Sequence, residues 1–352
     1  MVALYFTSVE ADGKTALCAG IGKKLLGQGR KVGFLKPFQI SETGTANGYK
    51  DINFIKQAFA LEESNEQLSP IHLTRSDLLQ KLTNEAEPLV QRIKQAYTQV
   101  ASNKDIVLME GLGDLGTDDV STRACYTIAR ALEAKVIVIL RYSPTMSASG
   151  ISPVSKELGQ RLLGVVINLV PPAKMEAVQQ DIKPLFQNAG IKVLGTLPQV
   201  RSLLGITVGE LSEALGGEIV SGQEKADDLV ENVMLGAMTP DSGLDYFNRK
   251  INKAAIIRGT RADMQLAALE TSTKCLVLTS NIKPLPPVAS HAEDKDVPVI
   301  VVSQDTSGAV AGIEEALAKA RFNNLQKLQD FEDVLDSYFE LEALTSGLGL
   351  KV

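Results

Sequence analysis

The stretch that decides the fold is Thr7-Ser8-Val9-Glu10-Ala11-Asp12-Gly13-Lys14-Thr15. It leads from a short apolar run, residues 3–8, into a helical pattern that starts at Gly13. A buried strand followed at once by Gly-Lys-Thr at a helix start is the setting of a phosphate-binding loop. Gly13 lets the backbone approach a phosphate, and the free N–H groups of the helix point to the same place. The Lys14 ammonium would then meet the β- and γ-phosphates, and the Thr15 hydroxyl would ligate Mg²⁺.

The same loop departs from the usual GxxxxGK[ST] pattern in two ways. Ser8 stands where the pattern has its first glycine, and Glu10 and Asp12 place two carboxylates in the loop. These carboxylates would repel a triphosphate unless they face away from it or meet its metal ion. The interpretation that competes with phosphate binding is an ordinary strand-to-helix turn with an exposed lysine. The predicted nucleotide contacts in this loop are Ser8, Glu10, Ala11, Asp12, Gly13, Lys14 and Thr15.

Short apolar runs alternate with amphipathic stretches through residues 1–200. Near-continuous apolar strands that are each followed by a helix predict an α/β fold, with a parallel sheet flanked by helices. Right-handed crossovers bring the carboxyl ends of the strands to one edge, where open α/β sheets bind their ligands. The predicted strands are residues 3–8, 31–37, 105–110, 135–141, 163–169 and 192–197, and the predicted helices are residues 13–28, 51–61, 84–101, 122–133 and 173–188.

The pattern then restarts and predicts a second, smaller α/β domain over residues 205–322, after a first domain over residues 1–200. Thr207, with Glu210 three residues later, has the spacing of a capping box that opens a helix. Pro284, Pro286 and Pro287 indicate a loop inside this domain. Residues 323–352 are expected to form a C-terminal helical tail. The strands predicted here are residues 230–238, 254–258, 274–279 and 297–302, and the helices are residues 207–215, 261–270, 307–321 and 324–338.

Composition excludes several classes of protein. The chain of 352 residues has a net charge of −6, so we expect no general affinity for nucleic acid or for an anionic membrane. Three widely spaced cysteines and two histidines argue against a zinc site, a disulfide framework or a Ser-His-Asp triad. No apolar run approaches the roughly 20 residues of a membrane helix, and no targeting segment opens the chain. We therefore expect a cytoplasmic globular protein.

The first half resembles the dethiobiotin synthetase family, whose distant relatives include cobyrinic acid a,c-diamide synthases and partitioning ATPases. The matching residues are Gly13-Lys14-Thr15, Lys36-Pro37, Asp51, Glu110-Gly111-Leu112-Gly113 and Asn168. The resemblance implies a P-loop NTPase-like fold that binds ATP or GTP with Mg²⁺. It also implies a role for each residue. Lys14 and Lys36 act on the transferred phosphate as catalytic residues, Asn168 contacts the nucleotide base, and the ligands of Mg²⁺ are Thr15, Asp51 and Glu110.

Elementary chemistry agrees with these roles, but each residue also has a purely structural interpretation. Hydroxyl and carboxylate oxygens are the ligands that Mg²⁺ prefers, and two lysines would neutralise charge on a phosphoryl group. In the structural interpretation, Lys36 is a solvated lysine at a strand end and Asp51 is a helix N-cap. Glu110 is then a strand-end carboxylate that balances Arg123, and Asn168 is a turn residue before two prolines.

The second half resembles the DRTGG domain, which follows a dethiobiotin-synthetase-like region in long phosphate acetyltransferases. The matching stretches are residues 233–238, 259–270 and 303–306, but Thr260 replaces the aspartate of the family's Gly-Asp-Arg. Arg258 and Arg261 flank a strand-to-helix turn that either holds an anion or pairs the arginines with surface acids. Because the chain ends at Val352, we expect the acetyltransferase domain of those long enzymes to be absent.

Three functions remain open at this point. The first is a regulatory protein that binds nucleotide, senses a small effector at the DRTGG-like domain and acts on a metabolic enzyme such as a phosphate acetyltransferase. The second is an ATP-dependent ligase or amidase that activates a carboxylate as an acyl phosphate. The third is a scaffold that has lost nucleotide binding. The domain order and the altered loop favour the first. Relatives of this fold also imply a homo-oligomer.

Overall fold

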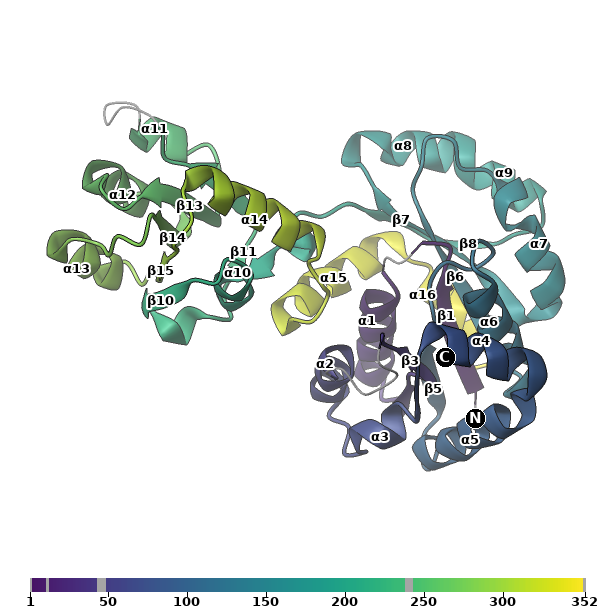
Figure 1. Cartoon of the computed structure of the whole chain (residues 1–352). Coiled ribbons are helices and arrows are strands. Elements are labelled where there is room, and N and C mark those ends of the chain that lie inside the picture. The colour runs from purple at the N-terminus through teal and green to yellow at the C-terminus, as the bar shows by residue number, and fades with distance from the viewer. Residues whose placement is uncertain (1, 11–12, 43–48, 238–242, 351–352) are drawn as a thin grey trace. The chain divides into compact units, whose positions relative to one another are not determined.

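The computed structural model describes residues 2–10, 13–42, 49–237 and 243–350. These residues form two compact units (Figure 1). The first unit comprises Met1–Gln199 together with Phe322–Val352, and the second comprises Val200–Arg321. Among the described residues, no helix is both long enough and apolar enough to cross a lipid bilayer.

The first unit is built on a parallel sheet of six strands in the order β2-β5-β1-β6-β7-β8. Apolar residues dominate these strands and are buried on both faces, as expected for a sheet between two helical layers. The α/β fold with a central parallel sheet is thereby confirmed. The strands are β1 (Val2–Ser8), β2 (Val32–Leu35), β5 (Ile106–Glu110), β6 (Lys135–Arg141), β7 (Leu162–Val170) and β8 (Val193–Pro198).

Helices cover both faces of this sheet. Right-handed crossovers place α1 on one face and α5, α6 and α7 on the other, and α6 contacts both α5 and α7. A small parallel ribbon of β3 (Phe38–Ile40) and β4 (Ile71–Leu73) follows β2. The helices up to β7 are α1 (Lys14–Gly27), α2 (Lys50–Phe59), α3 (Asn65–Leu68), α4 (Arg75–Asn84), α5 (Ala86–Val100), α6 (Asp119–Ala131) and α7 (Ala148–Leu158), followed by the 3-10 turn η1 (Gly159–Arg161).

The stretch predicted as one helix over residues 173–188 is divided in the structure. A π-helical segment, η3 (Val178–Ile182), separates α8 (Met175–Ala177) from α9 (Lys183–Asn188), after a 3-10 turn η2 (Pro172–Lys174). Pro184 has no N–H to donate to the preceding turn, which removes one α-helical hydrogen bond and accounts for the widened helix. The prediction of a single regular helix was wrong for this reason.

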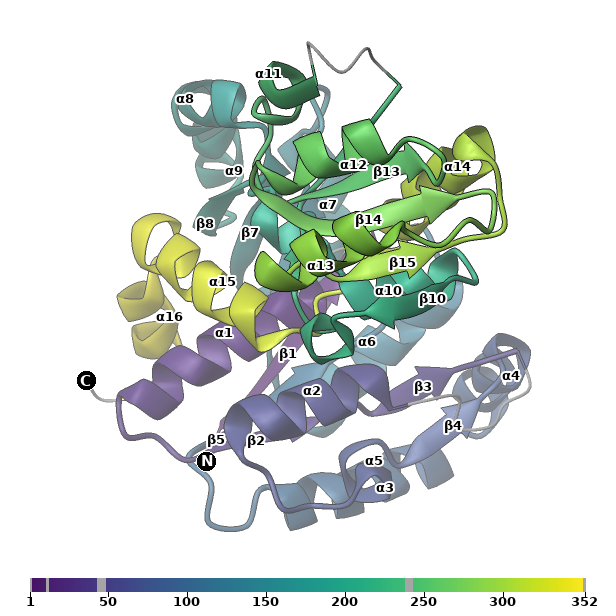
Figure 2. The same ribbon diagram turned by 90° about the vertical axis from the view of Figure 1, so that its left-hand side faces the viewer.

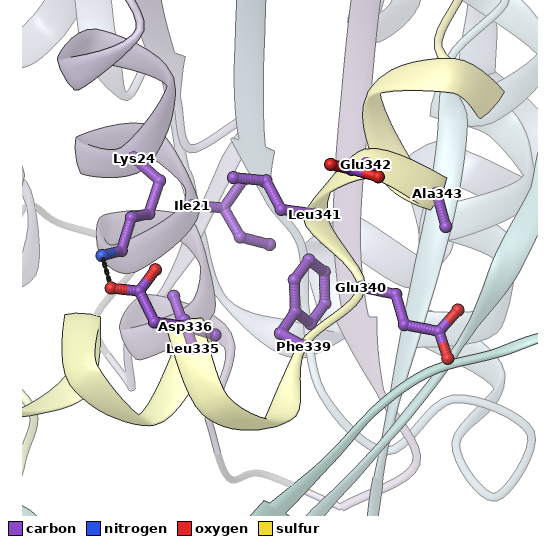
Figure 3. A pocket seen from close by; sticks show the side chains of 9 residues that line it. All are labelled: Ile21, Lys24, Leu335, Asp336, Phe339, Glu340, Leu341, Glu342 and Ala343. Atoms are coloured by element: carbon purple, nitrogen blue, oxygen red, sulfur yellow. Dashed lines mark hydrogen bonds and ion pairs between the residues drawn. The ribbon is translucent and has the colours of Figure 1, made fainter.

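The C-terminal helices α15 (Leu325–Tyr338) and α16 (Leu341–Gly347) belong to the first unit. Figure 2 shows α15 alongside α1, which it contacts directly. A side chain on Gly20 of α1 would lie 2.6 Å from a methyl group of Leu335, so this glycine admits α15. A cavity of about 430 Å³ lies between α1 and the turn that joins α15 to α16 (Figure 3). Its α1 wall is Ile21 and Lys24, so it lies along the second half of that helix and not at its N-terminus.

The second unit is built on a five-stranded sheet in the order β10-β15-β14-β13-β12. The strands β12 to β15 are parallel to their neighbours, and β10 pairs antiparallel to β15. One apolar cluster under α11, α12 and α13 and another under α10 and α14 cover the two faces. The strands are β10 (Glu218–Ser221), β12 (Asn232–Leu235), β13 (Lys253–Arg258), β14 (Thr273–Thr279) and β15 (Val299–Val301), with a separate ribbon of β9 (Ile206–Thr207) and β11 (Leu229–Val230).

Two local sequence signals of the second unit, a capping box and a group of prolines, lie at the starts of helices. The capping box at Thr207 and Glu210 is confirmed at the start of α10 (Val208–Ala214). The loop predicted around the prolines was wrong in part, because Pro286 and Pro287 open α13 (Pro286–Asp294), where proline's fixed φ suits the first helical turn. The other helical elements are 3-10 turns η4 (Ser202–Leu204) and η5 (Gln223–Lys225), and helices α11 (Gly243–Phe247), α12 (Ala262–Leu269) and α14 (Thr306–Ala318).

Candidate phosphate site

Most of the residues singled out in the first half lie at the carboxyl edge of the six-stranded sheet. Ser8 is the last residue of β1, Glu110 is the last residue of β5, and Lys36 follows the end of β2. These three strands are neighbours in the order β2-β5-β1 and run parallel. The edge therefore gathers polar groups from strands that are far apart in the sequence.

The N-terminus of α1 is left open. Gly13 is its N-cap residue and has φ 93°, a left-handed conformation that favours glycine. No side chain caps the helix, and no acidic residue lies in its first turn. A β-carbon on Gly13 would lie 2.4 Å from Nδ2 of Asn168. Gly13 therefore supplies no side-chain cap to the first N–H groups of α1 among the described residues, and N–H groups at a helix start are the groups that bind anions.

Lys14 lies over the turn that leads into α1. Its Nζ donates a hydrogen bond to Oγ of Ser8 at 3.0 Å, and Ser8 is fully buried. Ser8, which replaces the first glycine of the usual pattern, therefore holds the lysine at the sheet edge. The Glu10 carboxylate is exposed and lies 3.9 Å from Nε of Arg141. Ala11 and Asp12, which were predicted as nucleotide contacts, lie outside the described residues.

An irregularity at the end of β7 directs Asn168 to this turn. The next residue, Leu169, has φ 57°, and the pairing of β7 with β8 shifts register between Ile167 and Val170. The carbonyl of Asn168 accepts a hydrogen bond from the N–H of Tyr142 at 2.9 Å. A left-handed leucine is uncommon and costs backbone strain, which is typical of functional sites. The base-contacting role of Asn168 stays a prediction.

A second group of residues at the same edge is a buried ion triplet. Nζ of Lys36 lies 2.8 Å from Oε1 of Glu110 and 2.9 Å from Oδ2 of Asp51. The exposed fractions of the three side chains are 17% for Lys36, 23% for Asp51 and 4% for Glu110. Burial acts to lower the pKa of Lys36, but the two carboxylates outweigh it and hold that pKa well above its ordinary value. Lys36 is therefore firmly charged.

The structure decides between the interpretations of two of these residues. Tyr49 is the N-cap residue of α2, so Asp51 lies in the first turn and is not the cap. Arg123 pairs with Asp119 at 2.8 Å, and the partner of Glu110 is Lys36. Lys36 is held in place by its own backbone N–H, which donates to the carbonyl of Leu68 at 2.7 Å.

Thr15 lies half-buried in the first turn of α1. Asp51 and Glu110 are brought together around Lys36, and the role of Thr15 as a Mg²⁺ ligand stays a prediction. Cys18, one helical turn further along α1, lies beside the triplet. Burial raises the pKa of its thiol, and the Glu110 charge raises it further. This face of α1 therefore points towards the carboxylates.

The donor set fits a magnesium ion. Oε2 of Glu110 is buried and has no hydrogen-bond partner among the described residues, so acceptor capacity is left over at this position. Two carboxylates, with a hydroxyl on the adjacent helix, are hard oxygen ligands. The described residues hold no cluster of three or more His, Cys, Asp or Glu side chains that could bind a metal ion, so a hydroxyl, phosphate or water oxygen would have to complete the shell.

Thr7 was not singled out from the sequence, yet it shapes this edge. Its side chain is fully buried, and its hydroxyl donates to the carbonyl of Leu112 at 2.9 Å. The contact ties the end of β1 to the glycine-containing loop after β5. The sequence signal was weak, because a threonine in an apolar strand is ordinary and its partner lies 105 positions away.

In the second unit, the turn between β13 and α12 is internally neutralised. The Arg261 guanidinium pairs with Asp263 at 2.8 Å, which matches the interpretation of arginines paired with surface acids. The Gln265 amide donates to the carbonyls of Arg258 and Gly259, both at 3.1 Å, and so occupies the inside of the turn. Arg258 is exposed. Nothing in this geometry favours an anion over the acids already present.

The comparisons with known proteins agree with the two units. Residues 3–207 match the family described as an AAA domain, and residues 210–316 match the DRTGG domain. The phosphate acetyltransferase of a Synechocystis species is 23% identical over 339 residues, which cover 90% of this chain and 48% of that protein. The ATP-dependent dethiobiotin synthetase BioD of Methanococcus vannielii is 23% identical over 188 residues, which cover 52% of this chain and 86% of that protein.

The phosphate acetyltransferase of Nitratidesulfovibrio vulgaris is 24% identical and covers 98% of this chain and 51% of its own length. The chain thus spans about half the length of the phosphate acetyltransferases that it matches. Among solved structures, the MinD cell division protein of Aquifex aeolicus matches 58% of this chain and 85% of its own, with 16% identity and a TM-score of 0.35. The chain belongs to the AAA-domain family, as a P-loop domain related to dethiobiotin synthetase and to the N-terminal region of phosphate acetyltransferase, joined to a DRTGG domain.

Proposed function

We propose that this protein binds a magnesium–nucleoside triphosphate, ATP or GTP, at the carboxyl edge of its first sheet, and acts as a regulatory module. The single observation that carries the proposal is the open N-terminus of α1. It begins at a left-handed glycine, has no side-chain cap, and has Lys14 beside it. The macrodipole and the uncapped N–H groups of such a helix favour a polyphosphate.

Each residue has a defined part in this proposal. Gly13 and the first turn of α1 would receive the phosphates, and Lys14 would leave Ser8 to meet them. Thr15, Asp51 and Glu110 would hold Mg²⁺, which neutralises phosphate charge when it is bound. Lys36 would turn from its carboxylates to the terminal phosphate. Asn168, which lies against Gly13, would contact the base or the phosphate nearest to it.

Two features support regulation over catalysis. Glu10 adds a carboxylate to the loop that would oppose the charge of a triphosphate, although Arg141, 3.9 Å away, offsets part of that charge. Lys36, the second of the two lysines predicted as catalytic, is paired with two acids in this structure, so it would have to leave them before it could contact a phosphate. A ligase of the dethiobiotin synthetase type stays the alternative, since a dethiobiotin synthetase is 23% identical to this chain over 188 residues.

Calorimetry tests the nucleotide site. We expect Mg–ATP or Mg–GTP to bind the wild-type chain with measurable heat, and Lys14→Ala to abolish it. Lys24→Ala is the matched control, because Lys24 lies on the same helix but pairs with Asp336 at 2.6 Å. Equal heats for the wild type and Lys14→Ala would contradict the proposal. Phosphate release that depends on an added dicarboxylate or amino acid would instead support the ligase.

The regulatory part is tested separately. We propose that a small effector binds the second unit, and that a phosphate acetyltransferase is the enzyme regulated. A DRTGG-containing regulatory region of a Clostridium perfringens pyrophosphatase was solved with diadenosine tetraphosphate as its activator, with a TM-score of 0.30 and 17% identity to this chain, which makes that compound a first candidate to assay. Acetyltransferase activity measured with and without this chain and nucleotide tests the partner. The cytoplasmic location and the homo-oligomer stay predictions.

A further inference from the structure

The ion triplet at the sheet edge places a lysine where a metal ion is expected. Nζ of Lys36 lies within 2.9 Å of one oxygen from each of Asp51 and Glu110, the two carboxylates assigned to Mg²⁺ by the family resemblance. All three side chains are mostly buried. A single positive charge thus balances two acids that would otherwise repel each other in a medium of low dielectric constant.

We propose that Lys36 is a built-in counter-ion, which excludes a free divalent cation from Asp51 and Glu110 until a bound polyphosphate draws the lysine away. The inference rests on the proposed nucleotide site, because the phosphates provide the new partner for the lysine. It adds to the proposed function an order in which the two ligands bind. The metal enters with the nucleotide or after it, and does not occupy the empty protein.

Electrostatics gives the physical reason. A divalent cation that approached both carboxylates would meet the Lys36 ammonium within a few ångströms, and at such distances two like charges repel strongly even at an intermediate dielectric constant. The lysine has no other acceptor as strong as two carboxylates until a phosphate arrives. Its four-carbon stem is flexible, so the head group can then move while the backbone stays fixed at Leu68.

The unused oxygen of Glu110 is consistent with this exchange. Oε1 is taken by Lys36, but Oε2 is buried without a hydrogen-bond partner among the described residues. A fixed structural triplet would gain by satisfying that oxygen, since a buried unsatisfied acceptor costs free energy. A divalent cation in place of the Lys36 ammonium would be coordinated by Oε2 as well.

The test is metal binding to the nucleotide-free protein, with Mn²⁺ as the paramagnetic probe for Mg²⁺ and electron paramagnetic resonance as the readout. We expect wild type to bind Mn²⁺ weakly. Lys36→Gln, which leaves both carboxylates without their counter-ion, should bind Mn²⁺ at least about tenfold more tightly. Lys24→Gln, which removes the lysine partner of the exposed Asp336 on α15, should show no gain. The gain should be lost in Lys36→Gln/Glu110→Gln.

Lys36→Gln removes the charge between two buried acids and therefore lowers the stability of the fold. Thermal unfolding serves as the second measurement. Millimolar Mn²⁺ should raise the Tm of Lys36→Gln and of Lys36→Met, and leave that of wild type almost unchanged. Equal Mn²⁺ affinities for wild type and Lys36→Gln, with equal responses of Tm, would overturn the inference.

A nucleotide arm separates this inference from the proposed function. Adding ATP to wild type should increase its affinity for Mn²⁺, and by reciprocity Mn²⁺ should increase its affinity for ATP. If wild type binds no ATP while Lys36→Gln still gains Mn²⁺ affinity, the proposed function fails and the counter-ion role stands. If wild type binds Mn²⁺ tightly without ATP, the counter-ion role fails whatever the nucleotide does.

Discussion

Each of the two units carries a strand, a tight turn and a helix at the carboxyl edge of its parallel strands, but the two turns are finished differently. The first turn of α1 contains no acidic residue, and Lys14 lies beside the turn that leads into it. The turn from β13 to α12 contains its own acid, Asp263, paired with Arg261, and is filled by the Gln265 amide. The turn of the first unit therefore offers a lysine and helix N–H groups to an anion. In the turn of the second unit, the arginine is paired with an acid and the carbonyls accept from the Gln265 amide.

The buried lysines of the two units differ in the same way. Lys36 lies between two carboxylates, which hold its pKa above the ordinary value despite burial. Lys253, at the start of β13, is fully buried and donates to Oγ1 of Thr271 at 2.8 Å and to the carbonyl of Ser272 at 2.9 Å. No carboxylate of the described residues pairs with it, and burial lowers its pKa to about 8. The buried lysine of the proposed site is thus compensated by carboxylates, whereas the buried Lys253 has only neutral acceptors among the described residues.

The largest expected effect is on nucleotide binding. Lys14→Ala should raise the Kd for Mg–ATP at least about 100-fold, or about 2.8 kcal/mol, because a charge-assisted contact to phosphate is lost. Arg258→Ala, at the corresponding edge of the second unit, should leave that Kd within about twofold, since its turn is already neutralised. Calorimetry on both variants checks this. A comparable loss in Arg258→Ala would show that the two turns do not differ as described.

The glycines of the two turns provide the next test. Gly13→Ala forces a side chain into a left-handed position and against Asn168, so it should lower the free energy of unfolding by roughly 1–2 kcal/mol and also weaken nucleotide binding. Gly259→Ala would bring its β-carbon to 2.7 Å from the carbonyl oxygen of Ile282, and backbone yields less than a side chain. It should cost roughly 1–3 kcal/mol of stability but leave nucleotide affinity unchanged.

Urea unfolding and calorimetry of both glycine variants separate these effects. The double variant Gly13→Ala/Asn168→Ala should recover the steric part of the loss and keep the part due to φ. If Gly13→Ala binds nucleotide as wild type does, close approach of the backbone at Gly13 is not needed for the ligand, and the open turn has no functional meaning.

Lys253 gives a pH-dependent effect of intermediate size. Its pKa in the folded state is about 8, below the ordinary 10.5, so the unfolded chain holds one more proton between these pH values. Stability of the wild type should therefore rise with pH over that window relative to Lys253→Met, by roughly 2–3 kcal/mol between pH 7 and pH 10. Urea unfolding at several pH values measures the difference between the two proteins. A difference that stays constant with pH would mean that Lys253 keeps its ordinary pKa in the folded protein and stays charged there, against the effect expected from its burial.

The same comparison shows what the sequence could and could not predict. The strand, the turn and the helix around Gly13-Lys14-Thr15 follow from local apolar periodicity and the Gly-Lys-Thr motif, and the capping box at Thr207 follows from spacing alone. The three-residue strands β3 and β4 are too short to show any alternation. The prediction differs from the structure at two prolines: Pro184 lies inside a stretch predicted as one regular helix, and Pro286, predicted to lie in a loop, opens a helix.

Local sequence patterns could not predict the contacts between residues that are far apart in the sequence. Lys36 meets acids 15 and 74 positions away, and only the order of strands in the sheet brings Glu110 next to it. The sequence predicts that these residues lie at one edge, but it gives them different ligands: Lys36 a phosphate, and the two acids a metal ion. Likewise, Asn168 reaches Gly13 because Leu169 adopts a left-handed conformation, which nothing in the identity of leucine predicts.

The smallest expected effect concerns the pair that closes the second turn. Arg261 and Asp263 are 33% and 38% exposed, and an ion pair this exposed is worth little. Arg261 lowers the pKa of Asp263, so the stability from the pair is present above the ordinary pKa of an aspartate and is lost as pH falls through the lowered value. Arg261→Ala should therefore reduce the free energy of unfolding by about 0.5 kcal/mol or less at neutral pH, and by less still in acid.

Asp263→Asn is the more direct test of the difference between the two turns, because it removes the acid and leaves Arg261 beside the start of the helix. If this change alone made the second unit bind ATP, the acid in its first turn would be the feature that distinguishes the two turns.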